Sequence, residues 1–162
     1  MNRKYSRGDF LDCVEALRSA DPQYTFTTDV IVGFPGETDQ DFEETLRIVE
    51  DVGFIKVHIF PFSPRERTKA YTFSSQLPVS VINERKKHLA HVAREVAYRE
   101  QRRRIGDTLS VLVERVDEGI AYGHSSYFDM VGFPADPDVS VNTLIDVRIE
   151  SVEEDILKGK RV

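Results

Sequence analysis

The feature that most restricts the fold of this chain is the succession of strand, turn, helix and strand between residues 24 and 60. Residues 24–32 (YTFTTDVIV) are rich in β-branched and aromatic side chains, which predicts a buried strand. A Gly-Phe-Pro-Gly turn and an amphipathic helix over residues 38–52 follow, and residues 54–60 (FIKVHIF) predict a second strand. A helix that connects two neighbouring strands returns the chain to the same end of the sheet, so the strands run parallel. The pattern therefore predicts a βαβ unit.

The segments on either side of this unit predict two further helices and one irregular stretch. Ser6 and Asp9 are suited to cap a first helix, whose apolar residues recur at helical spacing and in which Cys13 is expected to be a small core residue. Residues 61–78 hold three prolines and show no period, which is typical of a functional loop or one wrapped around something. Residues 80–104 predict a long helix, and Gly106 stands where a helix stop is expected.

The pattern changes to short alternating segments after Gly106. Four or five strands in 56 residues, joined by connections of hairpin length, predict a small closed antiparallel β-barrel of the oligonucleotide-binding type. The expected fold class is therefore α/β plus β. The expected divisions are an α/β part over residues 1–79, a long basic linker helix over residues 80–106, and the barrel over residues 107–162.

Composition excludes several classes of protein. A chain that is 40% hydrophobic and 31% charged has enough apolar material for a core, and no apolar run approaches the 18 residues that a membrane span needs. The basic N-terminus has no apolar block after it, so we expect no secretory signal, no membrane partner and a cytoplasmic location. A single cysteine excludes a disulfide framework and any site that needs several thiolates.

Charge is unevenly distributed along the chain. Residues 80–106 hold eight Lys and Arg against three Asp and Glu, whereas residues 107–162 hold five against twelve. The overall charge of −6 argues against a general nucleic-acid binder. The basic run at Arg102, Arg103 and Arg104 has two interpretations, a solvated helix face or a contact for phosphate.

Few side chains form a catalytic or metal-binding pattern. The turn at residues 33–36 lies at the carboxyl end of a parallel strand, where ligands bind in α/β sheets, but it matches no phosphate-binding motif. Asp29, inside an apolar strand, needs a partner if it is buried: backbone, an arginine or a ligand. His58 has no second ligand at metal spacing, and His88 and His91 are expected to face solvent or phosphate. We therefore expect no metal site and no catalytic residue in this chain.

Longer stretches resemble the radical-SAM methylthiotransferases. The resemblance rests on TTDVIVGFPGETDQDFEETLRIVEDVGF and VHIFPFSPRERTKA, with the opening MNRKY, and the tail from Gly106 resembles the TRAM domain of these proteins. It implies the C-terminal remnant of a radical-SAM (β/α) barrel followed by an OB-like TRAM barrel. The family usually has Gly and Pro around Thr68, where this chain has Arg67 and Lys69, and we expect the loss of glycine to shift this loop.

The resemblance also implies an activity and its cofactors. His58-Ile59-Phe60-Pro61 and the basic helix look most like the MtaB type, which adds a methylthio group to N6-threonylcarbamoyladenosine beside the tRNA anticodon by radical-SAM chemistry. The parent enzyme would hold S-adenosyl-L-methionine and two [4Fe–4S] clusters. These clusters need six thiolates, so the chain by itself is expected to hold neither and to be inactive. It would supply one wall of the S-adenosylmethionine site, from Asp29, Ile31, Gly33, His58, Ile59 and Phe60.

The implied partner is the anticodon arm of tRNA. The residues expected to contact RNA are Arg65, Arg102, Arg103, Arg104, Arg115, Tyr122, Tyr127, Phe128, Arg148 and Lys160. Three alternatives stay open: a stand-alone RNA-binding module, a fragment of an isopentenyladenosine (MiaB-type) or ribosomal-protein (RimO-type) enzyme, and a structural piece. In the last case the exposed edge of the truncated barrel would drive self-association.

Overall fold

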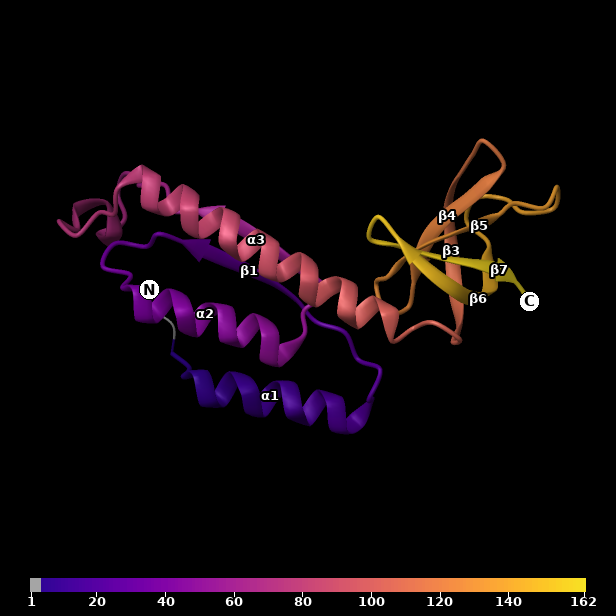
Figure 1. Cartoon of the computed structure of the whole chain (residues 1–162), viewed down its shortest axis with the longest axis horizontal. Coiled ribbons are helices and arrows are strands. Elements are labelled where there is room, and N and C mark those ends of the chain that lie inside the picture. The colour runs from indigo at the N-terminus through magenta and orange to yellow at the C-terminus, as the bar shows by residue number, and fades with distance from the viewer. Residues whose placement is uncertain (1–3) are drawn as a thin grey trace. The chain divides into compact units, whose positions relative to one another are not determined.

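The computed structural model describes residues 4–162, and the chain divides into two compact units (Figure 1). One unit is residues 26–97, and the other combines residues 1–25 with residues 98–162. Residues 1–3, the start of the MNRKY segment, lie outside the described residues. The division falls inside helix α3 (Val79–Arg102), which extends over nearly all of the predicted linker helix.

The unit of residues 26–97 contains the predicted βαβ arrangement. Strands β1 (Thr27–Val32) and β2 (Lys56–Pro61) pair in parallel, with Thr27 opposite Lys56 and Val32 opposite Pro61. Helix α2 (Asp39–Val52) connects them. It begins at a capping box, in which the Thr38 hydroxyl accepts from the Asp41 N–H and the Asp41 carboxylate accepts from the Thr38 N–H. The Thr38 hydroxyl also donates to the Asp41 carboxylate at 2.6 Å, and this bond, together with that from the Thr38 N–H, holds the pKa of Asp41 below its usual value.

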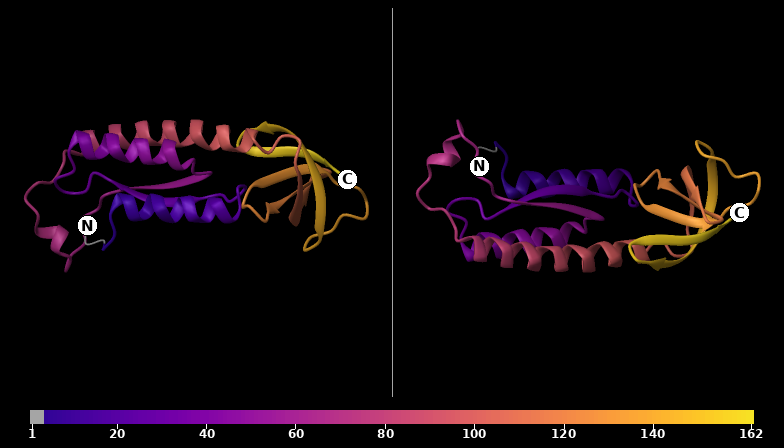
Figure 2. Two further views of the ribbon diagram at one scale, coloured as in Figure 1. Left: turned by 90° about the horizontal axis from the view of Figure 1, so that it is seen from below. Right: turned by 90° about the horizontal axis from the view of Figure 1, so that it is seen from above.

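The two helices of this unit lie on one face of the two-stranded sheet (Figure 2). Side chains from α2 and from the first turns of α3 are buried there: Phe42, Leu46, Val49, Val52, Ile82 and Leu89. The side chains of the opposite sheet face are exposed, so the prediction of a fully buried strand is wrong. A strand is buried on both faces only where elements cover both, and here the helices cover one.

The irregular stretch after β2 is packed against the turn that follows β1. It contains one short 3₁₀ helix, η1 (Lys69–Thr72). The Phe34 ring makes edge-on contacts with Phe62 and Phe73, at centroid distances of 5.3 and 6.3 Å, and the Gly36 N–H donates to the Ser75 carbonyl. Of the two interpretations of residues 61–78, a functional loop or a wrapped segment, the structure shows contacts of the second kind, between this stretch and the turn after β1.

Within that stretch, Arg67 stands at the position where the sequence comparison predicted a shift of the loop. Its φ is +68°, in the left-handed region that glycine adopts most easily. The chain therefore keeps a glycine-like backbone conformation at a residue that pays a steric cost for it.

The second unit is built on a five-stranded barrel closed in the order β3-β4-β5-β7-β6 (Figure 1). Its strands are β3 (Thr108–Asp117), β4 (Ile120–Ser125), β5 (Met130–Pro134), β6 (Leu144–Glu153) and β7 (Ile156–Arg161). The number agrees with the four or five strands expected after Gly106. The expectation of a purely antiparallel barrel is wrong at one seam, because β5 and β7 pair in parallel. The chain crosses from β5 to β6 before it turns back, which places β7 beside β5 in the same direction.

The inside of the barrel is filled by alternate residues of every strand. Nine buried side chains form this core: Leu109, Val111, Val113, Ala121, Val131, Phe133, Val147, Ile149 and Leu157. Two glycines allow neighbouring backbones to approach closely. A Cβ at Gly123 would stand 1.8 Å from the Leu112 carbonyl oxygen, and one at Gly159 would stand 2.2 Å from that of Arg148.

Helix α1 (Arg7–Ala20) begins as predicted, with the Ser6 hydroxyl accepting from the Asp9 N–H in a second capping box. The expectation that Cys13 is a core residue is wrong: Cys13 is exposed and the next residue, Val14, is buried. One position along a helix is a rotation of about 100°, which takes Cys13 off the apolar stripe. Among residues 4–162, no helix combines the length and the apolar character that a membrane crossing requires.

Closure of the barrel predicts the cost of adding one methyl group. Gly123→Ala is expected to lower the free energy of unfolding by about 3 kcal/mol, because the new Cβ meets backbone that cannot move aside. Gly119→Ala is the matched control. Its Cβ meets no atom within 4 Å, and only its φ of +80° is strained, so it should cost about 1 kcal/mol. Urea unfolding followed by circular dichroism measures both, and equal costs would contradict the close approach of β3 and β4.

Candidate functional site

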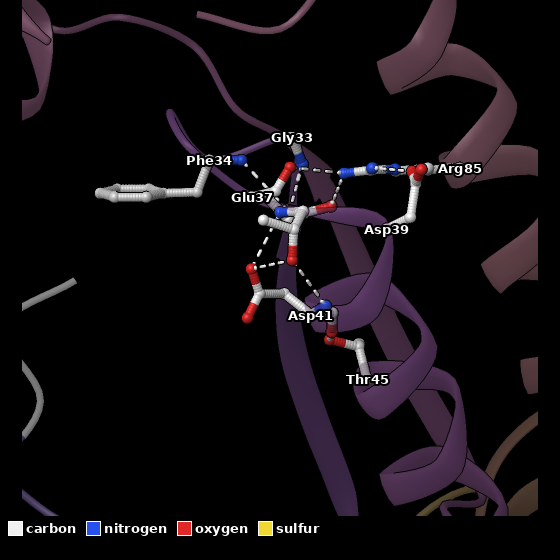
Figure 3. A network of polar contacts seen from close by, with 8 residues as sticks. Gly33, Phe34, Glu37, Asp39, Asp41, Thr45 and Arg85 are labelled. Atoms are coloured by element: carbon white, nitrogen blue, oxygen red, sulfur yellow. Dashed lines mark hydrogen bonds and ion pairs between the residues drawn. The ribbon is translucent and has the colours of Figure 1, made fainter. Parts of the chain in front are cut away.

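The carboxyl end of β1 is fixed by one carboxylate, that of Glu37 (Figure 3). Glu37 Oε2 accepts from the backbone N–H of Gly33 at 2.8 Å and from that of Phe34 at 3.3 Å. Its other oxygen, Oε1, lies 2.6 Å from Arg85 Nη1. The turn between β1 and α2 is therefore stabilised by the side chain of Glu37, the residue directly after it. The turn also lacks the lysine that a phosphate-binding loop would need.

Arg85 joins α3 to this turn (Figure 3). Its guanidinium is buried, with 8% of the side chain exposed, and it also donates to the Glu37 carbonyl at 3.2 Å and to Asp39 at 2.6 Å. The ring of Phe42 lies 5.4 Å from its central carbon. Burial by itself lowers the pKa of Arg85, but the hydrogen bonds with Asp39 and Glu37 outweigh it and the pKa is raised. Arg85 is therefore charged whenever the unit is folded.

Gly33 has a steric reason to be glycine. Its φ is +80°, and a Cβ there would stand 2.5 Å from Cγ1 of Ile82. The space that a side chain would occupy is thus filled by α3, and Gly33 is buried. Gly33 is among the residues that the resemblance places in a cofactor site, and within this unit its missing side chain makes room for α3.

Four of the residues expected to line a cofactor site lie together on the exposed face of the two-stranded sheet. The register pairs Asp29 with His58 and Ile31 with Phe60. Ile31 is 39% exposed and Phe60 is 50% exposed, with the two polar side chains next to them. The fifth, Ile59, points to the helix-covered face. The expectation that Asp29 is buried and needs a partner is wrong, because its side of β1 is not covered.

The exposed sheet face has the chemistry that a nucleoside requires. Two apolar side chains can contact a flat ring, and the carboxylate of Asp29 and the imidazole of His58 supply polar groups beside them. The adenosine of S-adenosylmethionine fits this set. An iron–sulfur cluster does not fit this chain, because it needs several thiolate ligands. The chain has one cysteine, on α1, and no group of three metal-ligating side chains occurs within residues 4–162.

The residues expected to contact RNA separate into exposed and buried groups. Arg65, Arg102, Arg103, Arg115, Phe128, Arg148 and Lys160 are exposed. Tyr122 and Tyr127 are half-buried. Arg148 and Lys160 are register partners on the outside of β6 and β7, and Lys160 contacts Glu150 at 2.5 Å. Arg102 lies over Tyr98, and Arg103 pairs with Glu100 at 2.7 Å.

Arg104 is the exception, because it is buried inside its unit and is 6% exposed. It donates to the Gln23 carbonyl at 2.7 Å, lies 3.4 Å from Asp129 and covers the Tyr127 ring at 4.3 Å. The Thr25 hydroxyl donates to the Tyr127 carbonyl in the same place. Burial raises the pKa of Asp129, and the charge of Arg104 offsets part of that effect. The prediction of a phosphate contact at Arg104 is therefore wrong, since this side chain joins residues 21–25 to the barrel.

Sequence reasoning missed both members of the pair that fixes the strand end, Glu37 and Arg85. Glu37 had one weak signal, a carboxylate directly before the helix cap at Thr38, where free backbone N–H groups gather. Arg85 gave none. It is 48 residues away from Glu37, in a helix rich in exposed basic residues, and only the folded unit distinguishes it from them.

Comparison with known proteins finds one family model and several relatives that are similar to this chain. Residues 1–49 match the family model of the radical SAM superfamily. The whole chain is 64% identical to a threonylcarbamoyladenosine tRNA methylthiotransferase MtaB of Chlamydia pneumoniae, and covers 38% of that protein. It is 42% identical, over 99% of its length, to the Thermotoga maritima protein of the same name, of which it again covers 38%. It is 38% identical over its whole length to a tRNA-2-methylthio-N(6)-dimethylallyladenosine synthase of Bdellovibrio bacteriovorus, of which it covers 36%.

The chain thus spans little more than a third of the length of these curated relatives. The predicted resemblance to methylthiotransferases is confirmed over the whole chain, and that to the radical SAM superfamily over residues 1–49. Among these three relatives, identity is highest with an MtaB protein, which is the type that the sequence indicated.

The Glu37–Arg85 pair predicts an unequal double-mutant cycle. The coupling between Arg85→Met and Glu37→Gln is expected to be about 2 kcal/mol, because both side chains are shielded from water. The coupling between Arg85→Met and Asp39→Asn should stay below about 1 kcal/mol, since the Asp39 side chain is 99% exposed and water screens its charge. Urea unfolding of the single and double variants gives both values. A larger coupling for Asp39 would contradict the central position of Glu37.

Proposed function

We propose that this chain is the C-terminal part of a tRNA methylthiotransferase that adds a methylthio group to N6-threonylcarbamoyladenosine beside the anticodon. The observation that carries the proposal is the 64% identity over the whole chain with a protein named for this reaction. The arrangement of the two units supports it, because a βαβ unit with one exposed sheet face and a separate barrel are suited to a cofactor and to RNA. Such an enzyme would work in the cytoplasm, where tRNA is modified.

In this proposal the unit of residues 26–97 is a remnant of the radical-SAM barrel. Its exposed face, with Asp29, Ile31, His58 and Phe60, would form one wall of the S-adenosylmethionine site. Ile59 and Gly33 would act from behind this wall, by packing against the helices. Bound S-adenosylmethionine supplies the radical chemistry of this superfamily, while the residues of this chain bind and orient its adenosine part.

The two [4Fe–4S] clusters of such an enzyme would be held outside the residues of this chain. One exposed cysteine cannot ligate either cluster. The chain by itself is therefore proposed to be inactive and to contribute binding surfaces. The free edges of β1 and β2, which within residues 4–162 pair only with each other, would be covered by further barrel strands in the parent. When exposed, these edges would promote self-association of the isolated chain.

The barrel would correspond to the TRAM domain and would bind the anticodon arm of tRNA. Exposed cations in the same unit as the barrel support this role: Arg102, Arg103, Arg115, Arg148 and Lys160. Arg65, in the unit of residues 26–97, would be a separate contact. Phosphate attraction is limited by the acidic composition of residues 107–162. Aromatic side chains on the outer surface, Tyr122 and Phe128, would supply the rest of the contact.

A second candidate function is transfer of the methylthio group to dimethylallyladenosine. The 38% identity with a synthase named for that nucleoside favours it, but less strongly than the 64% identity with the MtaB protein. The ribosomal-protein type and a stand-alone RNA-binding module have no such observation in their favour.

A segment exchange tests the proposed reaction directly. In the Chlamydia pneumoniae relative, the stretch that matches this chain is replaced by residues 1–162. We expect the chimaera to form 2-methylthio-N6-threonylcarbamoyladenosine on tRNA, as measured by mass spectrometry of digested nucleosides. The same chimaera with Glu37→Ala should lose most of this product, because the end of β1 would no longer be held. Product on dimethylallyladenosine alone would favour the second candidate, and no product on either substrate would contradict the proposal.

The basic end of α3 predicts a second result, in binding of whole tRNA by this chain. The double variant Arg102→Ala and Arg103→Ala should weaken binding, and should make the slope of log K against log salt less steep by about 1.4, since two phosphate contacts are lost. Arg104 stays unchanged in this pair, because its removal would disrupt the buried contacts of its unit. Lys86→Ala with Lys87→Ala, two exposed residues earlier in α3, is the charge-matched control. Equal losses in both double variants would show that the effect is one of net charge.

A further inference from the structure

The outside of the barrel carries an aromatic ring between two cations. Tyr122 is the register partner of Arg115 on β3, and the central guanidinium carbon lies 4.1 Å from the centre of the ring. On the other side, Lys158 of β7 places its Nζ 5.4 Å from the same ring. Cations are attracted to an aromatic face, so both contacts are favourable. Three strands, β3, β4 and β7, thus direct side chains to one point on the outer surface.

Gly132 determines how this ring lies. It is the register partner of Tyr122 on β5, and a Cβ there would stand 3.1 and 3.2 Å from two ring carbons. Without a side chain at Gly132, the ring lies close over the backbone of β5. The Arg115 side chain above it keeps 57% of its surface exposed. The result is a flat, positively charged stack that is held by the barrel and open to solvent.

A second stacked pair lies further along the same face of β4. His124 is two residues after Tyr122, so both side chains point outward, about 7 Å apart along the strand. The Phe128 ring stacks on His124, with centroids 5.0 Å apart and planes inclined by 24°. Phe128 is 61% exposed and has a φ of +68°. A bulky residue in this conformation is strained, and packing gives little in return, which is typical of a contact for a ligand.

We propose that the Tyr122 surface, defined by Arg115, Tyr122, His124, Phe128 and Lys158, stacks unpaired bases of a single-stranded RNA segment. The inference rests on the proposed role in tRNA modification and adds which part of the barrel contacts RNA and in what form. An RNA base offers a flat face to the Arg115–Tyr122 stack, and the neighbouring phosphates offer negative charge to Arg115 and Lys158. In an RNA duplex the base faces are covered by neighbouring pairs, so this surface would not reach them.

The charges around the Tyr122 surface indicate whether base stacking or attraction to phosphate contributes more to RNA binding. Asp117 lies 3.5 Å from Arg115, and Glu114 bonds to His124 at 2.8 Å. Within the described part of the chain, Lys158 makes no ion pair. Since two carboxylates reduce the local positive potential, general attraction to a polyanion is weak there. Binding would then depend on base stacking, with about two phosphate contacts at most.

The test uses the full chain and a labelled twelve-nucleotide RNA without internal pairing, with its duplex as the second probe, in fluorescence anisotropy. Tyr122→Leu should weaken binding of the single strand about tenfold, which is within the range for loss of one stacked base. Tyr122→Phe should bind almost as the unchanged chain does, since the ring is kept. The slope of log K against log salt should be near −1.4, and Arg115→Gln should bring it about 0.7 closer to zero.

Tyr98→Leu is the matched control, because Tyr98 is an exposed tyrosine that also has an arginine, Arg102, over its ring at 5.9 Å. It should leave binding of the twelve-nucleotide strand unchanged. Arg115→Gln removes an exposed side chain, so it keeps the test valid if Tyr122→Leu does not fold. Equal binding of strand and duplex, or equal losses in Tyr98→Leu and Tyr122→Leu, would overturn the inference. If the chimaera modifies tRNA while Tyr122→Leu binds normally, this inference fails and the proposed function stands.

Discussion

The unit of residues 26–97 depends on the carboxylate of Glu37. It satisfies two backbone N–H groups at the end of β1 and neutralises the buried charge of Arg85 at the same time. Loss of Glu37 would leave Arg85 with the exposed Asp39 as its remaining carboxylate partner, and loss of Arg85 would leave Glu37 with backbone N–H groups alone. Either loss weakens the compensation of a charge that is shielded from water, which is costly. The same contact ties α3 to the turn after β1, where Ile82 fills the space beside Gly33. The exposed sheet face keeps its shape because the opposite side of the strands is fixed so firmly.

The barrel solves a different problem, which is to close a sheet with only five strands. Its backbones come so close at Gly123 and Gly159 that no other residue fits. The parallel seam between β5 and β7 completes the ring of hydrogen bonds. Because closure fixes which residues face inward, it also fixes which face outward, and Tyr122 and His124 point to solvent for the same reason that Ala121 and Gly123 are buried. The proposed RNA surface is thus a consequence of the core.

Arg104 shows how a basic run can serve two purposes. Arg102 and Arg103 are exposed, while the third arginine enters the unit and meets Asp129, Tyr127 and the Gln23 carbonyl. Helix α3 ends at Arg102, and the turn that follows it directs Arg104 into the unit. Three identical side chains in sequence therefore carry one structural contact and two available charges, and a variant that removes all three would confuse the two effects.

The sequence by itself determined the elements, the capped start of the first helix, the parallel pair of strands and the resemblance to a family. These depend on local patterns: apolar periodicity, Ser6 and Thr38 at helix starts, and turns between short strands. Only the tertiary structure decided that Asp29 is exposed and that Glu37 binds Arg85. It also decided that Cys13, expected in the core, is exposed and that Arg104, expected to contact RNA, is buried. Each of these depends on which element covers which face, and that depends on contacts between residues far apart in the chain. A periodic apolar pattern shows which face of a helix or strand is packed, but it does not show which other element packs against that face.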